Sequence, residues 1–224
     1  MGIAGGEQVG LSLSKIDRPG PVHALLWRGS ASSLVDLNPN GFSASWANAT
    51  NGAIQVGAGS VVNVINGWHA LKWSGSADSV VDLDPNGVRS EARGVAGDQI
   101  VGHGLIDGSA HAMLWTSRGV VDLNPSGFAG SFANATDGVQ QVGMGTIGGQ
   151  NHALLWSGTA GSAVDLHLCA YFLTVAVGVS DGQQVGYALL STSSDVYHAL
   201  LWTGTAQSVV NLHSSGFLST QAEL

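Results

Sequence analysis

The pattern of apolar and polar positions in this chain contains one short sequence motif that is repeated five times, here called the phrase. In each copy a His is followed four positions later by a Trp, and the residues between them are mostly apolar. A Val-Gly pair precedes each His, and Val-Asp-Leu follows each Trp, with Val-Asn-Leu in the fifth copy. Repetition this regular predicts one structural unit used five times. The phrase comprises His23, Trp27 and Asp36; His69, Trp73 and Asp82; His111, Trp115 and Asp122; His152, Trp156 and Asp165; and His198, Trp202 and Asn211.

The spacing of the phrase predicts the architecture. Successive Trp residues lie 46, 42, 41 and 46 positions apart, and repeats of about 40 to 45 residues with four strand-like segments are typical of propeller blades. We therefore predict an all-β protein, a five-bladed β-propeller with four-stranded antiparallel blades around a narrow central channel. The chain forms one domain, 1–224, with repeats at about 2–46, 47–91, 92–132, 133–176 and 177–224.

The innermost strand of each repeat is expected just before a turn rich in Gly, Asn and Asp. Because such a strand is already present at the start of the chain, we predict that the fifth and first blades close the ring without residues 217–224 pairing as a strand in the first blade. In the fourth repeat, residues 167–172 replace an Asn-Pro-x-Gly-Phe turn, which predicts a different connection there. The five innermost segments are 2–4, 48–50, 94–96, 134–136 and 178–180.

Composition narrows the classes of partner. Only 10% of residues are charged and 44% are hydrophobic, which excludes a disordered chain. The net charge of −8 with no basic cluster argues against nucleic acid and anionic membranes as partners. No apolar run approaches the roughly 20 residues of a membrane span, so no membrane insertion is expected, and we expect a monomer. The single cysteine, Cys169, excludes an intrachain disulfide, and we expect it to be a buried thiol.

The five histidines invite a metal hypothesis, but geometry argues against it. The His-to-Trp strand is the third from the axis, at least roughly 10 Å out, so histidines of neighbouring blades are separated by roughly 12 Å or more. Ligands of one zinc ion lie about 2 Å from it. We therefore expect no metal and no cofactor. The recurring His, Trp and Asp are instead expected to form a hydrogen-bond network inside each blade, in which Asn211 still accepts a hydrogen bond.

Catalysis requires acids that the innermost segments lack. Glycoside cleavage uses two carboxylates, and the innermost segments carry no Asp or Glu. Glu91, just before the third copy, is the only acid close by. A glycoside hydrolase-like enzyme therefore stays a third alternative, and we predict no catalytic residues.

The phrase also resembles a known repeat. His-Ala-Leu-Leu-Trp, with Gln-Val-Gly before it and Val-Asp-Leu after it, is similar to the HAF-type repeat of bacterial extracellular proteins, and the resemblance covers essentially the whole chain. It departs where Leu or Met replaces the usual Phe, and Lys72 lies in the equivalent run of the second copy. The resemblance implies an extracellular or cell-surface location and supports a propeller, and it carries no activity with it.

A binding role is expected where the copies differ, because loops on a rigid scaffold carry most ligand contacts. The leading hypothesis is a non-enzymatic extracellular binding propeller whose partner is a carbohydrate or another surface protein. The alternative is a purely structural repeat unit of a larger surface protein. Exposure of Trp46 and Trp68, the two Trp residues outside the repeated position, would distinguish an open stacking surface from packing between blades. The candidate binding residues are Trp46, Trp68, Tyr197, Asp17 and Arg18.

Overall fold

The fold consists of five antiparallel four-stranded sheets, one for each repeat, and strand order within each sheet follows the chain. The structure is a computed structural model that describes residues 2–12, 21–62, 64, 67–84, 89–191 and 196–222. The strands are β1 (Ile3–Ala4), β2 (Glu7–Leu11), β3 (Ala24–Trp27), β4 (Val35–Asp36), β5 (Phe42–Thr50), β6 (Gln55–Val61), β7 (Trp68–Trp73), β8 (Val81–Asp82), β9 (Ser90–Ala96), β10 (Gln99–Ile106), β11 (Ser109–Thr116), β12 (Gly119–Asp122), β13 (Gly130–Thr136), β14 (Gln141–Ile147), β15 (Gln150–Trp156), β16 (Val164–Asp165), β17 (Leu173–Ser180), β18 (Gln183–Leu189), β19 (Tyr197–Trp202) and β20 (Val210–Asn211).

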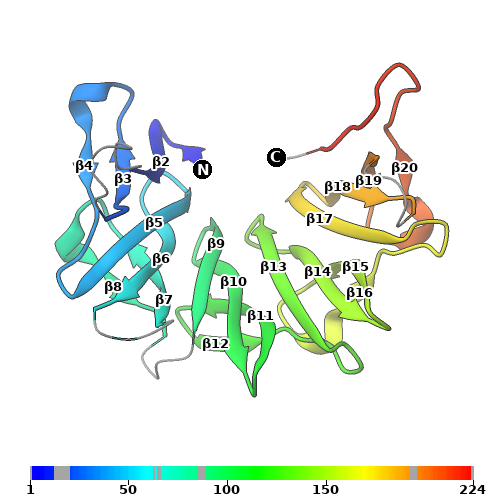
Figure 1. Cartoon of the computed structure of the whole chain (residues 1–224), viewed down its shortest axis with the longest axis horizontal. Helices are drawn as coiled ribbons and strands as arrows, with labels where there is room; N and C mark the ends of the chain where they lie inside the picture. The colour runs from blue at the N-terminus through cyan, green and yellow to red at the C-terminus, as the bar shows by residue number, and fades with distance from the viewer. Residues whose placement is uncertain are drawn as a thin grey trace.

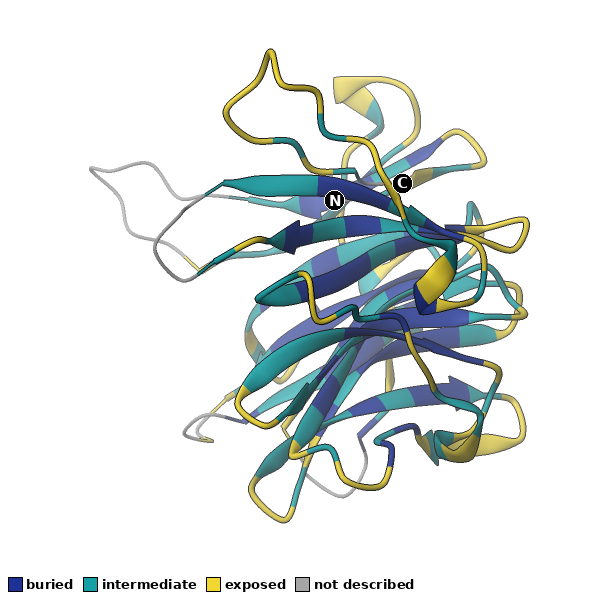
Figure 2. Cartoon of the chain, turned by 90° about the vertical axis from the view of Figure 1, so that its right-hand side faces the viewer, coloured by how far each residue is buried: buried dark blue, intermediate teal, exposed yellow. Residues whose placement is uncertain are grey.

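The sheets are arranged as an arc with their first strands toward the centre (Figure 1). The arc is open between the first and fifth sheets, and both termini lie at the opening (Figure 1). The perpendicular view also places the two termini near each other (Figure 2). The described residues include no α-helix, and none of their helices has the length and apolarity that a membrane crossing requires. Short 3-10 helices join the third and fourth strands in four sheets: η1 (Ala31–Ser33), η2 (Ala77–Ser79), η3 (Ala160–Ser162) and η4 (Ala206–Ser208).

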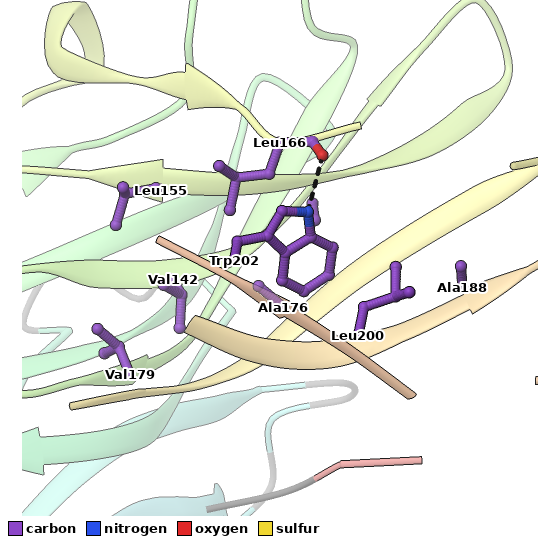
Figure 3. Packing of buried hydrophobic residues seen from close by; sticks show 9 residues of the cluster. Val142, Leu155, Leu166, Ala176, Val179, Ala188, Leu200 and Trp202 are labelled. Atoms are coloured by element: carbon purple, nitrogen blue, oxygen red, sulfur yellow. Dashed lines mark hydrogen bonds between the residues drawn. The ribbon is translucent and has the colours of Figure 1, made fainter. Parts of the chain in front are cut away.

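The hydrophobic core is divided into four clusters, each between two consecutive sheets. In every cluster the repeated Trp of one sheet meets the Leu of the preceding Val-Asp-Leu. Between the fourth and fifth sheets, Trp202 packs in a cluster with Leu166 and Val142, and its indole N–H donates to the Leu166 carbonyl at 3.1 Å (Figure 3). The apolar pattern on both faces of the third strands is therefore explained by face-to-face packing of sheets.

No core cluster of the described residues joins the fifth sheet to the first. The residues of the first and fifth sheets that would form such an interface are partly exposed to solvent. Trp27, the repeated Trp of the first sheet, is partly exposed, whereas Trp73, Trp156 and Trp202 are fully buried. Leu212 of the fifth sheet is 47% exposed, whereas its counterparts Leu37, Leu123 and Leu166 are 0% exposed. The predicted closure between the fifth and first blades is thus not made in this structure.

Each innermost strand from β5 onward carries a β-bulge at the same place. The register shifts between Ala47 and Ala49, and the corresponding shifts in β9, β13 and β17 skip one residue each. We call the four bulged residues Asn48, Arg93, Asn134 and Val177 the bulge column. The bulge moves the innermost strand onto the repeated Val-Gly of the next strand: a β-carbon at Gly57, Gly102, Gly143 or Gly186 would overlap the carbonyl oxygen of Trp46, Glu91, Phe132 or Val175.

A second repeated feature is a hydrogen bond that marks the start of an innermost strand. A Ser or Thr hydroxyl accepts a hydrogen bond from the backbone N–H of the Ala after the repeated His, as Ser45 does for Ala24 at 3.0 Å. The residue after Val-Asp-Leu, Asn38 in that copy, holds the same hydroxyl at 2.7 Å. In the fourth connection His167 does the same for Thr174 at 3.1 Å, so the predicted change of turn keeps this contact. The corresponding hydroxyls are Ser45, Ser90, Ser131, Thr174 and Thr220.

The C-terminal segment, residues 213–222, therefore ends with the same Ser/Thr contact that marks the start of an innermost strand. Thr220 donates its N–H to the Tyr197 carbonyl at 2.7 Å, and its hydroxyl accepts from Ala199 at 3.0 Å. These bonds keep the segment on the fifth sheet, and residues 217–222 form no strand within the first sheet. Residues 223 and 224 lie outside the described part of the chain.

Two expectations about local structure were wrong. From β5 onward the innermost strands are longer than the turn signals indicated, because the residues before the bulge also pair with the second strand. β5, for example, begins at Phe42 rather than Asn48. Cys169 is exposed rather than buried, because it lies in the turn before β17 instead of in a strand. Exposed residues gather in such turns and connections and in the outermost strands, whereas the residues of the inner strands are mostly buried or intermediate (Figure 2).

Candidate functional site

The repeated His and Asp form a hydrogen bond in each of the first four sheets. His23 Nδ1 lies 2.7 Å from Asp36 Oδ2, and the same pair recurs at 2.7, 2.8 and 2.7 Å in the next three sheets. In the fifth sheet the amide nitrogen of Asn211 lies 2.9 Å from His198 Nδ1, so Asn211 donates this hydrogen bond and does not accept it as expected. The Trp residues take no part in this pair, and the buried indole nitrogens of Trp73 and Trp156 have no partner. The pair stays within one sheet, and the described residues contain no group of three potential metal ligands.

The divergent residues meet elsewhere, on the face of the arc where the innermost strands begin. Trp46 on β5 and Trp68 on β7 are both partly exposed, and their rings meet edge to face with centroids 6.4 Å apart. The exposed guanidinium of Arg89, just before β9, lies 3.5 Å from the ring centroid of Trp68, in a cation–π contact. The two Trp residues are therefore packed against each other and against an Arg, and they do not form an open platform.

Glu91 on β9 links this aromatic pair to the centre of the arc. One carboxylate oxygen accepts from the indole N–H of Trp46 at 3.2 Å and from the Asn48 amide at 2.9 Å. The other oxygen lies 3.6 Å from a guanidinium nitrogen of Arg93. One oxygen accepts two hydrogen bonds and the other lies only within ion-pair range of Arg93, so Glu91 serves here as a structural acceptor.

Arg93 and two rings continue the cluster into the fourth sheet. The Arg93 guanidinium lies 5.2 Å from the Phe132 ring centroid, and the His103 ring packs against Phe132 with centroids 4.7 Å apart. Burial, and secondarily the charge of Arg93, lowers the pKa of His103 to about 4. His103 is therefore neutral near pH 7, and its buried Nδ1 has no hydrogen-bond partner. We call Trp46, Trp68, Arg89, Glu91, Arg93, His103 and Phe132 the rim cluster.

The bulge column lines a cavity at the centre of the arc. This central cavity has a volume of about 300 Å³, and all four bulged residues contribute to its wall. The bulge explains their orientation, because a bulged residue has no cross-strand partner and its side chain is turned away from the regular alternation. Arg93 is the one charged residue among those that line the cavity, and most of the others are Gly, Ala and Val.

The structure brings together some of the candidate binding residues and separates others. Trp46 and Trp68 belong to the rim cluster, whereas Tyr197 lies on the fifth sheet and packs edge to face on Tyr187 with centroids 5.4 Å apart. Asp17 and Arg18 lie outside the described residues.

Sequence reasoning missed Arg89, Arg93 and His103 as members of a site. Arg93 was missed because the innermost strands were aligned on their turns, and β9 has one more residue than β5 between its bulge and its turn. Alignment on the Ser/Thr-x-Ala that starts each strand, as in Ser45 to Ala47 and Ser90 to Ala92, would have found it.

Comparison with known proteins identifies the fold and no family. No protein-family model matches the sequence, and no curated protein matches it significantly. Among solved structures, a protein assigned as TolB from Agrobacterium tumefaciens is similar, with TM-score 0.62 and 13% identity over 92% of this chain and 81% of that one. TolB from Acinetobacter baumannii is similar over 97% of this chain and 53% of its own length, with TM-score 0.61 and 12% identity. Puromycin hydrolase is similar over 93% and 36%, with TM-score 0.63 and 12% identity. The chain thus has a propeller-like fold, and it spans about half or less of the last two proteins.

Proposed function

We propose that this protein is a non-enzymatic binding module whose rim cluster docks an acidic segment of another protein. The observation that carries the proposal is the meeting of the two non-repeated Trp residues with Arg89 and Arg93 on one face. The chain has a net charge of −8 and only seven Lys and Arg residues. The rim cluster holds two of these Arg residues and one acid, Glu91, whose carboxylate is held inside the cluster. Aromatic residues and Arg are also the side chains most enriched at protein interfaces.

The packing of the two Trp residues favours a protein partner over a glycan. Carbohydrate stacking needs an open aromatic face, but Arg89 covers one face of Trp68, and Trp46 meets the Trp68 ring edge to face. An Arg stacked on an aromatic ring keeps its N–H groups directed outward for a carboxylate. A protein segment with Asp or Glu fits this arrangement better than a neutral sugar.

The engagement of Glu91 supports a role without catalysis. The residues that line the central cavity include no Asp or Glu, and Glu91 is held by Trp46, Asn48 and Arg93. The pair of carboxylates that glycoside cleavage uses is therefore not found among the described residues that line the central cavity. We further propose an extracellular or cell-surface location, which rests on the resemblance to the HAF-type repeat.

A random-peptide display library tests the proposed function. We expect the protein to enrich sequences rich in Asp and Glu, and Arg89→Gln to abolish the enrichment. Arg118→Gln is the matched control, since Arg118 is exposed in the β11–β12 turn at the opposite end of the strands. Enrichment that survives Arg89→Gln would contradict the proposal. Binding on a glycan array that depends on Trp68 would replace it by the carbohydrate alternative, and no binding in either assay would replace it by a structural repeat unit.

We also propose that the five sheets close into a five-bladed ring in solution. Three features of the open interface support closure: the partly exposed Trp27, the exposed Leu212, and Thr220, which already occupies the position of the strand-starting hydroxyl. Residues 220–222 correspond to 45–47, which precede the bulge, whereas Gly2 pairs with Val9 as the residues after the bulge do. The two segments would together complete the innermost strand of the first blade, so this proposal departs from the sequence-based expectation that residues 217–224 form no strand there. Trp27 would then pack on Leu212 as Trp202 does on Leu166.

A charged residue at the proposed closing interface tests the ring. If the ring closes, Leu212→Asp lowers the melting temperature almost as much as Leu166→Asp, because each would bury an unpaired carboxylate. If the arc stays open, Leu212→Asp behaves like the control Val139→Asp, whose residue is 73% exposed in a turn. A dimer by light scattering that Leu212→Asp converts to a monomer would instead assign the interface to a second copy and contradict the five-bladed ring.

A further inference from the structure

The central cavity has the composition of a binding site for one small polar group. Its volume of about 300 Å³ is in the range of small ligand pockets. Most of its wall is Gly, Ala and Val from the innermost strands, and its polar side chains are Asn48, Arg93, Asn134 and Thr136.

Most of these polar groups are already satisfied by the protein. The Asn48 amide donates to Glu91 and to the Ala92 carbonyl, and the Asn134 amide donates to the Ala176 carbonyl at 2.9 Å. The Thr136 hydroxyl lies 2.9 Å from a side-chain oxygen of Gln99. These three residues hold neighbouring sheets together and contribute little to the recognition of a ligand.

Arg93 is the exception. A guanidinium has five N–H donors in a planar fork. One donates to the side-chain oxygen of Asn134 at 3.0 Å, and the nearest Glu91 oxygen lies 3.6 Å from another nitrogen, beyond good hydrogen-bond length. The Arg93 side chain is about one-third exposed. Its charge is therefore held in place, only partly neutralised, and open to the cavity.

We propose that Arg93 binds a carboxylate in the central cavity through two parallel N–H···O bonds. The bidentate fork matches a carboxylate, and the fixed position lowers the entropy lost on binding. The proposal rests on the proposed function, because the carboxylate would be an acidic side chain or the C-terminus of the segment docked on the rim cluster. Arg93 then determines specificity, whereas Trp68 and Arg89 provide the outer contact.

The site can be tested without knowing the partner. Sodium glutarate is titrated into the full chain, and the Arg side-chain N–H and Trp indole signals are followed by NMR, with sodium chloride at matched ionic strength and glutaramide as controls. We expect saturable shifts of the Arg93 signal and of the Trp46 indole, which donates to Glu91 beside Arg93. Arg93→Gln should weaken glutarate binding by about tenfold or more, since a charged hydrogen-bonded pair is lost.

Two further variants keep the test specific. Arg93→Lys keeps the charge without the fork and should bind glutarate with intermediate affinity, whereas Arg118→Gln should bind as the unmodified protein does. Thermal melting is measured for each variant to check that it is folded. Saturable shifts that persist in Arg93→Gln, or no saturable shift in the unmodified protein, would overturn the proposal.

Peptides from the display selection identify the source of the carboxylate. Each peptide is compared in three forms: with a free C-terminus, with an amidated C-terminus, and with Glu replaced by Gln. Loss of affinity on amidation assigns the C-terminus, and loss on Glu-to-Gln replacement assigns a side chain. Peptides that bind the rim cluster equally well in the unmodified protein and in Arg93→Gln would leave the proposed function standing and overturn the role of Arg93.

Discussion

The outer strands keep the same residues from repeat to repeat, whereas the innermost strands differ at one repeated position. In the outer strands the His–Asp pair keeps its length between 2.7 and 2.8 Å in four sheets, and the fifth sheet keeps a contact with Asn in place of Asp. In the innermost strands the bulge column changes from Asn to Arg to Asn to Val. The residues are uniform where each sheet needs the same internal hydrogen bond. They differ at the bulge, where the side chain has no cross-strand partner. Ligand chemistry is therefore expected in the bulge column and not in the five-fold phrase.

The largest effect on stability is expected where the repeated Val-Gly of the second strand contacts the innermost strand. Gly143→Ala should lower the free energy of unfolding by about 3 kcal/mol or more, because the new β-carbon would overlap the Phe132 carbonyl and push the innermost strand away. Urea denaturation measures the loss. Gly161→Ala in η3 is the control and should change stability by less than about 0.5 kcal/mol, since a β-carbon there would meet open space. Equal effects of the two substitutions would disprove the steric role of the repeated Val-Gly.

A smaller effect is expected from pH at a divergent position. The pKa of His103 is about 4 in the folded protein, below its ordinary value of 6.5. As pH falls below 6.5 the unfolded chain takes up a proton that the folded chain does not, so the free energy of unfolding should fall by about 2 kcal/mol between pH 6.5 and 4. His103→Met, which copies Met144 of the next sheet, should make this pH dependence shallower.

Part of the pH dependence should remain in that variant. Burial, with the neighbouring His152 or His213, also lowers the pKa of His167 and of His198, and both act in the same direction. Denaturation curves at several pH values measure the slopes. An unchanged slope in His103→Met would show that the buried imidazole does not limit stability in acid.

The uniform pair of the outer strands should contribute modestly. Asp165→Asn reproduces the fifth copy and should change the free energy of unfolding by less than about 0.5 kcal/mol, because Asn still forms the hydrogen bond. Asp165→Ala should cost about 1 kcal/mol, since the Asp side chain is 43% exposed and water replaces part of the bond. If Asp165→Asn costs as much as Asp165→Ala, the charge and not the hydrogen bond is what the repeat preserves.

Among the substitutions that remove side-chain contacts, Arg93→Val in the bulge column is expected to have the smallest effect on stability. Arg93→Val copies Val177 and removes one hydrogen bond to Asn134 and one partly exposed ion pair. We expect a change of less than about 1 kcal/mol in the free energy of unfolding, measured beside Gly143→Ala in the same urea series. A loss as large as that of Gly143→Ala would show that the divergent column is as constrained as the outer framework.

The repeat predicted the sheets because its signals are local. Period, turn residues and apolar strands were enough to predict five four-stranded antiparallel sheets and the order of strands within them. The His–Asp contact also followed from residue types at a fixed spacing. Sequence alone did not reveal the bulges, because a bulge is a mismatch between two strands and leaves no mark in one of them.

The same reason explains the incomplete prediction of the site. Trp46 and Trp68 stood out as the Trp residues that break the repeat, but Arg89, Arg93 and His103 look like ordinary strand residues. They meet only because neighbouring sheets bring β9, β10 and β13 together. Contacts between sheets depend on three-dimensional placement, and no spacing along the chain encodes them.

The bulges have a consequence for how this scaffold can change. A bulged residue is skipped by the strand ladder, so its replacement alters the wall of the central cavity without altering a cross-strand pair. One position in each of the last four repeats thus sets the chemistry of one wall segment, although the side chains of Asn48, Arg93 and Asn134 also bond to the next sheet. A combinatorial library at 48, 93, 134 and 177 would sample receptors of different charge and size on one unchanged framework.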